Sequence, residues 1–160
     1  MQLIAEKLGK SDKLDRLRYV RDDGSSTQTA MPRQGILPHD LVHYVVESRL
    51  GLRNGFTGLV ARGAEASFAM EIAHDPAGRQ VETEAIQVEA VVEALQTQLW
   101  SGRFDQADFT EAVRTACMAR ERAPFDLAGI DAHALLYEGA LALTARWASV
   151  PFHGSLTLSF

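Results

Sequence analysis

The sequence is poor in features that cross-link or target a chain. Cys117 is the only cysteine among 160 residues, so no disulfide can form within the chain, which excludes a small secreted scaffold held by disulfides. We expect Cys117 on the inward face of a helix, as an inert thiol. The amino end, MQLIAEKLGK, carries charges after only a few apolar residues and has no signal-peptide core. These absences predict a cytoplasmic protein.

Long hydrophobic runs are also missing. The most apolar stretch, residues 132–145, contains His133 and Glu138, and it falls short of the ~18 apolar residues that a membrane-spanning helix needs. We therefore expect no membrane partner. With 46% hydrophobic and 23% charged residues, the composition is that of an ordinary globular protein that can bury a core without staples. A single domain over residues 1–160 is expected.

Positive charge is sparse and dispersed. The net charge is −5, and all three lysines lie within the first thirteen residues, where acidic residues alternate with them. Because no dense basic run is present, we expect no nucleic-acid partner. The glycines do not form G-x-G-x-x-G, and no phosphate-binding loop follows a strand, so a nucleotide cofactor is not expected either.

Both ends of the chain have the pattern of β-strands. Residues 1–31 contain three short strand-like segments, and Asp23-Gly24 between two of them is typical of a hairpin turn. Residues 154–160 alternate leucine and phenylalanine with serine and threonine, as a half-buried strand does. We predict a three-stranded antiparallel meander that the C-terminal strand joins, because this strand would cover one exposed edge.

Residues 38–148 have helical periodicity instead. The cap residues and the apolar spacing predict five helices, and these run from Pro38 to just before Gly51, over 55–74, over 81–100, after Asp105 and after Asp131. The fold class predicted is therefore α+β, a small antiparallel sheet of three N-terminal strands and the C-terminal strand packed on about five helices.

One stretch, residues 37–47, combines side chains that could carry chemistry. In a helix with about 100° per residue, His43 and Glu47 fall on the same side as His39. Two imidazoles one turn apart and a carboxylate one turn further can converge on one point, as binding of a divalent metal requires. We predict a metal site with His39, His43 and Glu47 as ligands for zinc, iron or nickel.

The pattern H-D-x-x-H, formed by His39, Asp40 and His43, resembles the H-E-x-x-H motif of the zincins, whose glutamate is the general base. The resemblance implies a catalytic role for Asp40, as base or as a residue that orients a ligand, although aspartate is one methylene shorter than glutamate. The pattern is also similar to that of a family of ubiquinone-biosynthesis proteins, which add a glutamate where this chain has Gly55.

A second fragment offers additional ligands. Glu71 and His74 have the E-x-x-H spacing of carboxylate metal sites on helices. If the second helix packs against the first, either side chain could complete the coordination of the metal. The alternative for His74 is a residue that stabilises a helix C-terminus ahead of Pro76.

Two functions from different classes follow. The first is divalent-metal binding, with a metal-dependent hydrolase or lyase as the activity. The second is a non-catalytic binding or assembly module, a homo-oligomer or an adaptor for a protein partner, suggested by the small residues of the second helix and by an exposed sheet edge. Independently of these two functions, the alternative to a metal site in residues 39–47 is that their polar side chains are only the solvent-facing side of an amphipathic helix.

Overall fold

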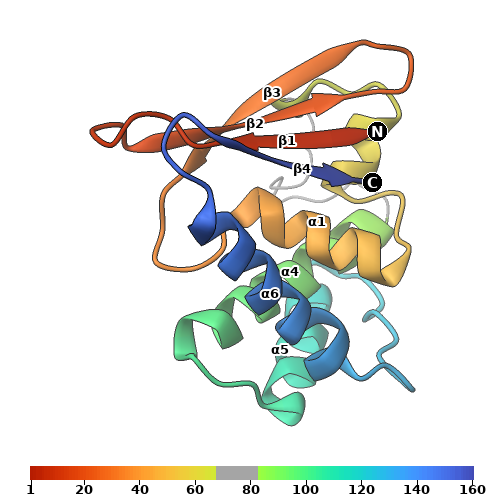
Figure 1. The fold of residues 1–160 in the computed structure, drawn as a ribbon. Coiled ribbons are helices and arrows are strands. Elements are labelled where there is room, and N and C mark those ends of the chain that lie inside the picture. The colour runs from red at the N-terminus through yellow and green to blue at the C-terminus, as the bar shows by residue number, and fades with distance from the viewer. Residues whose placement is uncertain (68–82) are drawn as a thin grey trace.

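The computed structural model describes residues 1–67 and 83–160. One antiparallel sheet has the strand order β3-β2-β1-β4, and its strands are β1 Gln2–Glu6, β2 Leu14–Val20, β3 Ser26–Pro32 and β4 Ser155–Ser159. The predicted meander is confirmed, and so is its extension by the C-terminal strand. Because β4 pairs with β1, the two ends of the chain lie side by side (Figure 1).

Alternation along the strands gives the sheet one apolar face. Leu3, Leu17 and Tyr19 are fully buried, whereas Arg16, between the inward-facing residues of β2, is exposed. Leu3 lies opposite Tyr19 on β2 and opposite Leu158 on β4, so the apolar side chains of neighbouring strands share one face. This face is the one on which the helices pack.

Between β3 and β4 the described chain is mainly helical, which confirms the α+β class. Asp105 caps α5 by accepting the backbone N–H groups of Ala107 and Asp108, both at 2.9 Å. No helix within residues 1–67 and 83–160 has both the length and the apolar character to cross a membrane. The helices are α1 His39–Leu50, α2 Phe56–Ala61, α4 Thr83–Ser101, α5 Gln106–Ala119, the short π-helix η1 His133–Tyr137 and α6 Glu138–Ser149.

The prediction of one continuous second helix over 55–74 is wrong. Helix α2 ends at Ala61, and Gly63 has φ of 107°, a value that no right-handed helix contains. Arg21, the residue that follows β2, fixes this end, since its guanidinium donates to the backbone carbonyls of Val60 and Ala64 at 2.7 and 2.6 Å. The part of the prediction from residue 68 onward lies outside the described residues.

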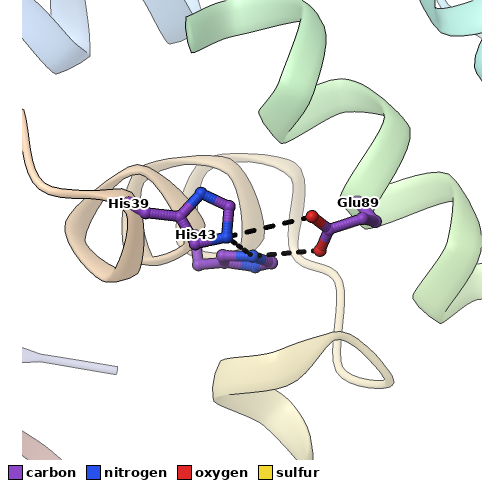
Figure 2. Close-up of side chains that lie close together, drawn as sticks. All are labelled: His39, His43 and Glu89. Carbon is purple, nitrogen blue, oxygen red and sulfur yellow. Dashed lines mark hydrogen bonds and ion pairs between the residues drawn. The ribbon is translucent and has the colours of Figure 1, made fainter. Parts of the chain in front are cut away.

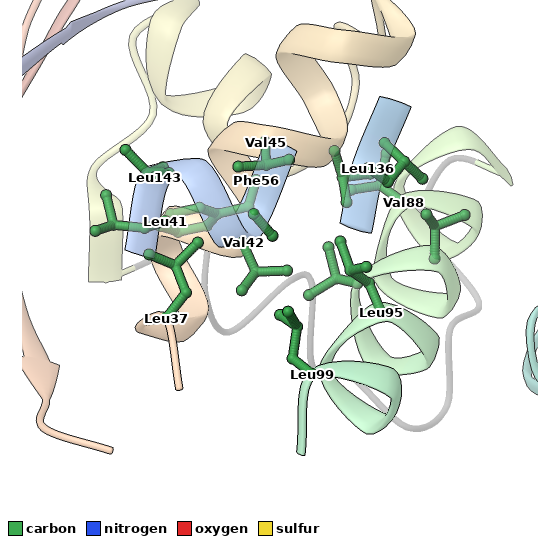
Figure 3. Close-up of a cluster of buried hydrophobic side chains, with 14 of the residues drawn as sticks. Leu37, Leu41, Val42, Val45, Phe56, Val88, Leu95, Leu99, Leu136 and Leu143 are labelled. Carbon is green, nitrogen blue, oxygen red and sulfur yellow. The ribbon is translucent and has the colours of Figure 1, made fainter. Parts of the chain in front are cut away.

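Helix α1 occupies the centre of the fold. It lies beneath the sheet, and α4 and α6 pack against it from the other side (Figure 1). The apolar core between these elements includes Val42, Leu95, Leu99 and Leu136 (Figure 3). Each such side chain contributes about 1.5–3 kcal/mol on full burial, so this layer fixes the position of α1 relative to α4.

Candidate metal centre

Helix α1 is buried on both of its faces. Pro38 is its N-cap, one residue before the helix begins at His39. The polar side chains are as inaccessible as the apolar ones, since Asp40 is 4%, His43 2% and Glu47 0% exposed. The alternative in which they form the solvent-facing side of an amphipathic helix is therefore wrong. Buried titratable groups need specific partners, because burial without a partner costs several kcal/mol.

Two histidines of α1 and one glutamate of α4 converge on a single point. His43 Nε2 lies 3.2 Å from His39 Nε2 and 3.2 Å from Glu89 Oε2, and His39 Nε2 lies 3.8 Å from Glu89 Oε1. Figure 2 shows both rings on the side of α1 that faces α4, with the carboxylate opposite them. This buried His-His-Glu cluster could hold a metal ion.

The spacing of the three groups fits one ion. A tetrahedral zinc with bonds of about 2.0–2.1 Å keeps its ligand atoms about 3.3–3.4 Å apart. The separations of 3.2, 3.2 and 3.8 Å lie within a few tenths of an ångström of that value. Small side-chain rotations would therefore bring all three groups to bonding distance.

Both histidines have an acceptor at Nδ1, as a metal-binding imidazole typically does. His39 Nδ1 lies 3.0 Å from Gln96 Oε1, and His43 Nδ1 lies 3.3 Å from Glu47 Oε1. Each of these oxygens is an acceptor, so each Nδ1 carries the hydrogen. When such a ring is neutral, its lone pair is on Nε2, which faces the cluster.

Glu47, predicted as a ligand, lies on the other side of His43. Its Oε1 accepts the backbone N–H of Thr57 at 2.8 Å, and its Oε2 accepts that of Gly58 at 2.9 Å. With the contact to His43 Nδ1 added, its carboxylate is directed away from the point where the Nε2 atoms meet. The structure thus brings His39 and His43 together with Glu89, and it places Glu47 behind His43.

Asp40, predicted as the catalytic residue, lies at the sheet side of the cluster. The hydroxyl of Thr29 on β3 donates to its Oδ2 at 3.3 Å. Burial, followed by the charges of Asp40 and Glu47, raises the pKa of Tyr19 well above its ordinary value, so these groups lie near one another. Within the described ranges, the buried hydroxyls of Tyr19 and Thr57 have no hydrogen-bond partner.

His43 is the residue of the cluster whose pKa is raised. Burial alone would lower its pKa, but hydrogen bonds to Glu47 and Glu89 outweigh burial and raise the pKa to about 10. Burial and the neighbouring charge of His43 lower the pKa of His39. In the absence of metal, His43 is thus an imidazolium between two carboxylates, and a divalent cation bound at the same point would replace its proton.

Glu89 is not among the ligands predicted from the sequence. A usable signal was present, because residues 85–95 are apolar around almost the whole circumference of α4. A helix of this kind is buried, so a glutamate within it requires a partner. The predicted additional ligands Glu71 and His74 lie outside the described residues.

Comparisons of the chain with protein-family models, with curated proteins and with solved structures find no match. Fold and site together define an α+β protein with a buried His-His-Glu cluster suited to a metal ion. Its function is inferred from the chemistry of that cluster.

Proposed function

We propose that the protein binds a divalent metal ion through His39, His43 and Glu89 and acts as a metal-dependent hydrolase or lyase. Two neutral imidazoles and one carboxylate form a ligand set found in catalytic zinc sites, and imidazole also suits iron and nickel. Zinc, iron(II) and nickel are accordingly the metals to test. Glu89 is thus the third ligand in this proposal, whereas the helical spacing predicted Glu47.

The observation that carries this proposal is the orientation of the two imidazole rings. Each ring is held at Nδ1 by a separate acceptor, Gln96 for His39 and Glu47 for His43. Both Nε2 atoms point to the same carboxylate. Metal-bound histidines are typically held in this way by an outer acceptor. A histidine that only filled space in the core would be replaceable by an apolar side chain at little cost.

Catalysis needs a free coordination position and a path to it. Three protein ligands leave at least one position open on the metal, and the side chain of His39 is 26% exposed, which leaves this edge of the cluster accessible. A metal in such a site lowers the pKa of a bound water and polarises a carbonyl group. Asp40 is the candidate base, because it follows His39 in the chain and its charge acts on that ring.

Elemental analysis of untagged protein tests metal binding. We expect stoichiometric zinc, iron or nickel in the wild-type protein and loss of that metal in His39→Ala and His43→Ala. His133→Ala is the matched control, since His133 is exposed on η1 and should leave the metal content unchanged. Metal-free wild-type protein after growth in metal-supplemented medium, with no change of melting temperature on adding any of the three metals, would refute the proposal.

Hydrolysis of p-nitrophenyl acetate by the metal-loaded protein tests the catalytic part separately. We expect a rate that disappears with a chelator and returns with the metal. Asp40→Asn should keep the metal and lose about 10²–10⁴-fold in rate, the usual contribution of a general base. If the metal is bound but Asp40→Asn reacts like wild type, Asp40 is not the base.

A further inference from the structure

Residues 53–58, called turn 53–58 below, comprise the end of the α1–α2 connection and the first residues of α2, and they are held by two carboxylates from different helices. Glu47 of α1 accepts the backbone N–H groups of Thr57 and Gly58 at 2.8 and 2.9 Å. Glu84 of α4 accepts those of Arg53 and Asn54 with one oxygen, both at 2.7 Å. Turn 53–58 thus connects the helix that carries the two histidines with the helix that carries Glu89.

Close packing leaves turn 53–58 little freedom to move without moving Glu47. A methyl group added at Gly55 would lie 2.7 Å from Glu47 Cδ and 2.8 Å from Val88 Cγ1, both closer than van der Waals contact allows. A methyl group at Gly58 would collide with the backbone carbonyl of Arg53. Glycine is therefore required at both positions, because the backbone of the turn is wrapped around the carboxylate of Glu47.

Turn 53–58 also contacts the cluster through an aromatic ring. The ring of Phe56 lies 5.4 Å from the ring of His43, centroid to centroid. His43 is therefore linked to this turn in two ways, directly through Phe56 and indirectly through Glu47, which lies 3.3 Å from His43 Nδ1.

We propose that Glu47 is a positioning residue that couples metal occupancy at the His39-His43-Glu89 cluster to the docking of turn 53–58. This inference rests on the proposed function. According to this inference, bound metal would also hold turn 53–58 more firmly in place, although this turn contains none of the metal ligands.

The coupling follows from the chemistry of imidazole. His43 Nδ1 contacts Glu47 in the metal-free protein as well, but a cation bound at Nε2 would in addition anchor the ring to His39 and Glu89 and so fix the direction of its Nδ1 hydrogen toward Glu47. Glu47 can accept the Nδ1 hydrogen of His43 and the backbone N–H groups of Thr57 and Gly58 at the same time only if its carboxylate keeps its position. A coupling free energy between two sites is reciprocal, so the contacts through which Glu47 holds Thr57 and Gly58 should also strengthen metal binding at His43.

The two carboxylates that hold the turn provide a matched pair of variants. Glu47→Gln places an amide NH2 against groups that already donate, whereas Glu84→Gln makes the same change at a partly exposed carboxylate without contact to His43. We expect Glu47→Gln to weaken zinc binding about 10–100-fold, the usual loss for an outer-shell partner. Glu84→Gln should change it less than about threefold, because solvent screens that charge. Competition with a chromophoric zinc chelator measures both affinities.

Amide hydrogen exchange of the wild-type protein, with and without zinc, supplies the second measurement and needs no variant to fold. We expect zinc to protect the amides of Thr57 and Gly58 by a larger factor than the amides of Arg53 and Asn54, which Glu84 holds.

The outcomes separate this inference from the proposed function. Zinc binding to wild type with equal losses in Glu47→Gln and Glu84→Gln, or with equal added protection at both pairs of amides, overturns the coupling and leaves the metal site intact. Failure of wild type to bind any of the three metals overturns both.

Discussion

The two faces of helix α1 differ in chemistry although both are buried. One face packs Leu41, Val42, Val45 and Val46 into the core, and the other holds Asp40, His43 and Glu47 in a network of hydrogen bonds. The apolar face stabilises the fold by burial alone. The polar face gains much less, because desolvation of charged groups offsets most of their mutual attraction.

This difference separates residues that maintain the fold from residues that carry the proposed chemistry. Apolar side chains placed on the polar face would meet the needs of folding equally well. Two histidines with aligned Nε2 atoms and an opposing Glu89 carboxylate are instead what a cation requires. Substitutions on the two faces should therefore change different quantities.

The largest effect is expected on the apolar face. Leu41→Ala should lower the free energy of unfolding by about 2–5 kcal/mol, since it leaves a cavity beside a fully buried helix. The zinc affinity of the folded fraction should stay near that of wild type, because Leu41 faces away from the cluster. Urea unfolding and zinc titration measure the two quantities. A large loss of affinity in folded Leu41→Ala would mean that the two faces are not independent.

Glu89→Gln should mainly change the zinc affinity and, through it, the stability that zinc adds. Wild-type protein at a zinc concentration one hundred times its dissociation constant gains about 2.7 kcal/mol of stability. Loss of the anionic ligand should weaken binding by roughly 100-fold or more, which reduces that gain to about 0.4 kcal/mol at the same concentration. Thermal unfolding with and without zinc measures the difference. An unchanged gain would exclude Glu89 as a ligand.

The pH dependence of stability should reverse when metal is added. In chelator, the pKa of His43 is about 10 in the folded protein against 6.5 for the free side chain, so its stabilisation is complete below pH 6.5 and is lost as pH rises toward 10. The lowered pKa of His39 acts only below about pH 6.5 and leaves this window unchanged.

Zinc inverts this slope because protons compete with the metal for the same nitrogen atoms. The stabilisation by zinc should therefore shrink as pH falls from 8 to 6. Unfolding curves in chelator from pH 6.5 to 10, and with zinc from pH 6 to 8, check both directions. His43→Gln is the control, and it should lose both slopes. Equal slopes in this variant and in wild type would show that His43 is not the titrating group.

The smallest effect on zinc affinity is expected for Gln96, the acceptor at His39 Nδ1. Gln96→Leu removes the oxygen that holds His39 Nδ1 but leaves all three ligands in place. We expect zinc affinity to fall about three- to tenfold, less than for Glu47→Gln, because a neutral amide accepts a weaker hydrogen bond than a carboxylate does. The chelator competition assay measures this. A loss larger than that of Glu89→Gln would reverse the assignment of inner and outer residues.

Local signals made most of the fold predictable. Strand alternation, the Asp23-Gly24 turn, the Asp105 cap and the left-handed Gly51 each depend on neighbouring residues, and each is found where expected. The prediction of the second helix failed because Gly63 and the contacts of Arg21 end this helix, and Arg21 is distant from it in the sequence.

The site was only half predictable for the same reason. His39 and His43 are one helical turn apart, so their convergence follows from spacing alone. Glu89 reaches them through the packing of α4 on α1, and Glu47 is drawn away by backbone N–H groups of a turn. Neither effect can be derived from helical periodicity.

Anomalous diffraction from crystals grown with zinc tests the central claim most directly. We predict one peak at about 2.0–2.2 Å from His39 Nε2, His43 Nε2 and a Glu89 oxygen, with Glu47 bound to His43 Nδ1 and not to the metal. A peak coordinated by Glu47 in place of Glu89, or no peak between α1 and α4, would contradict the account.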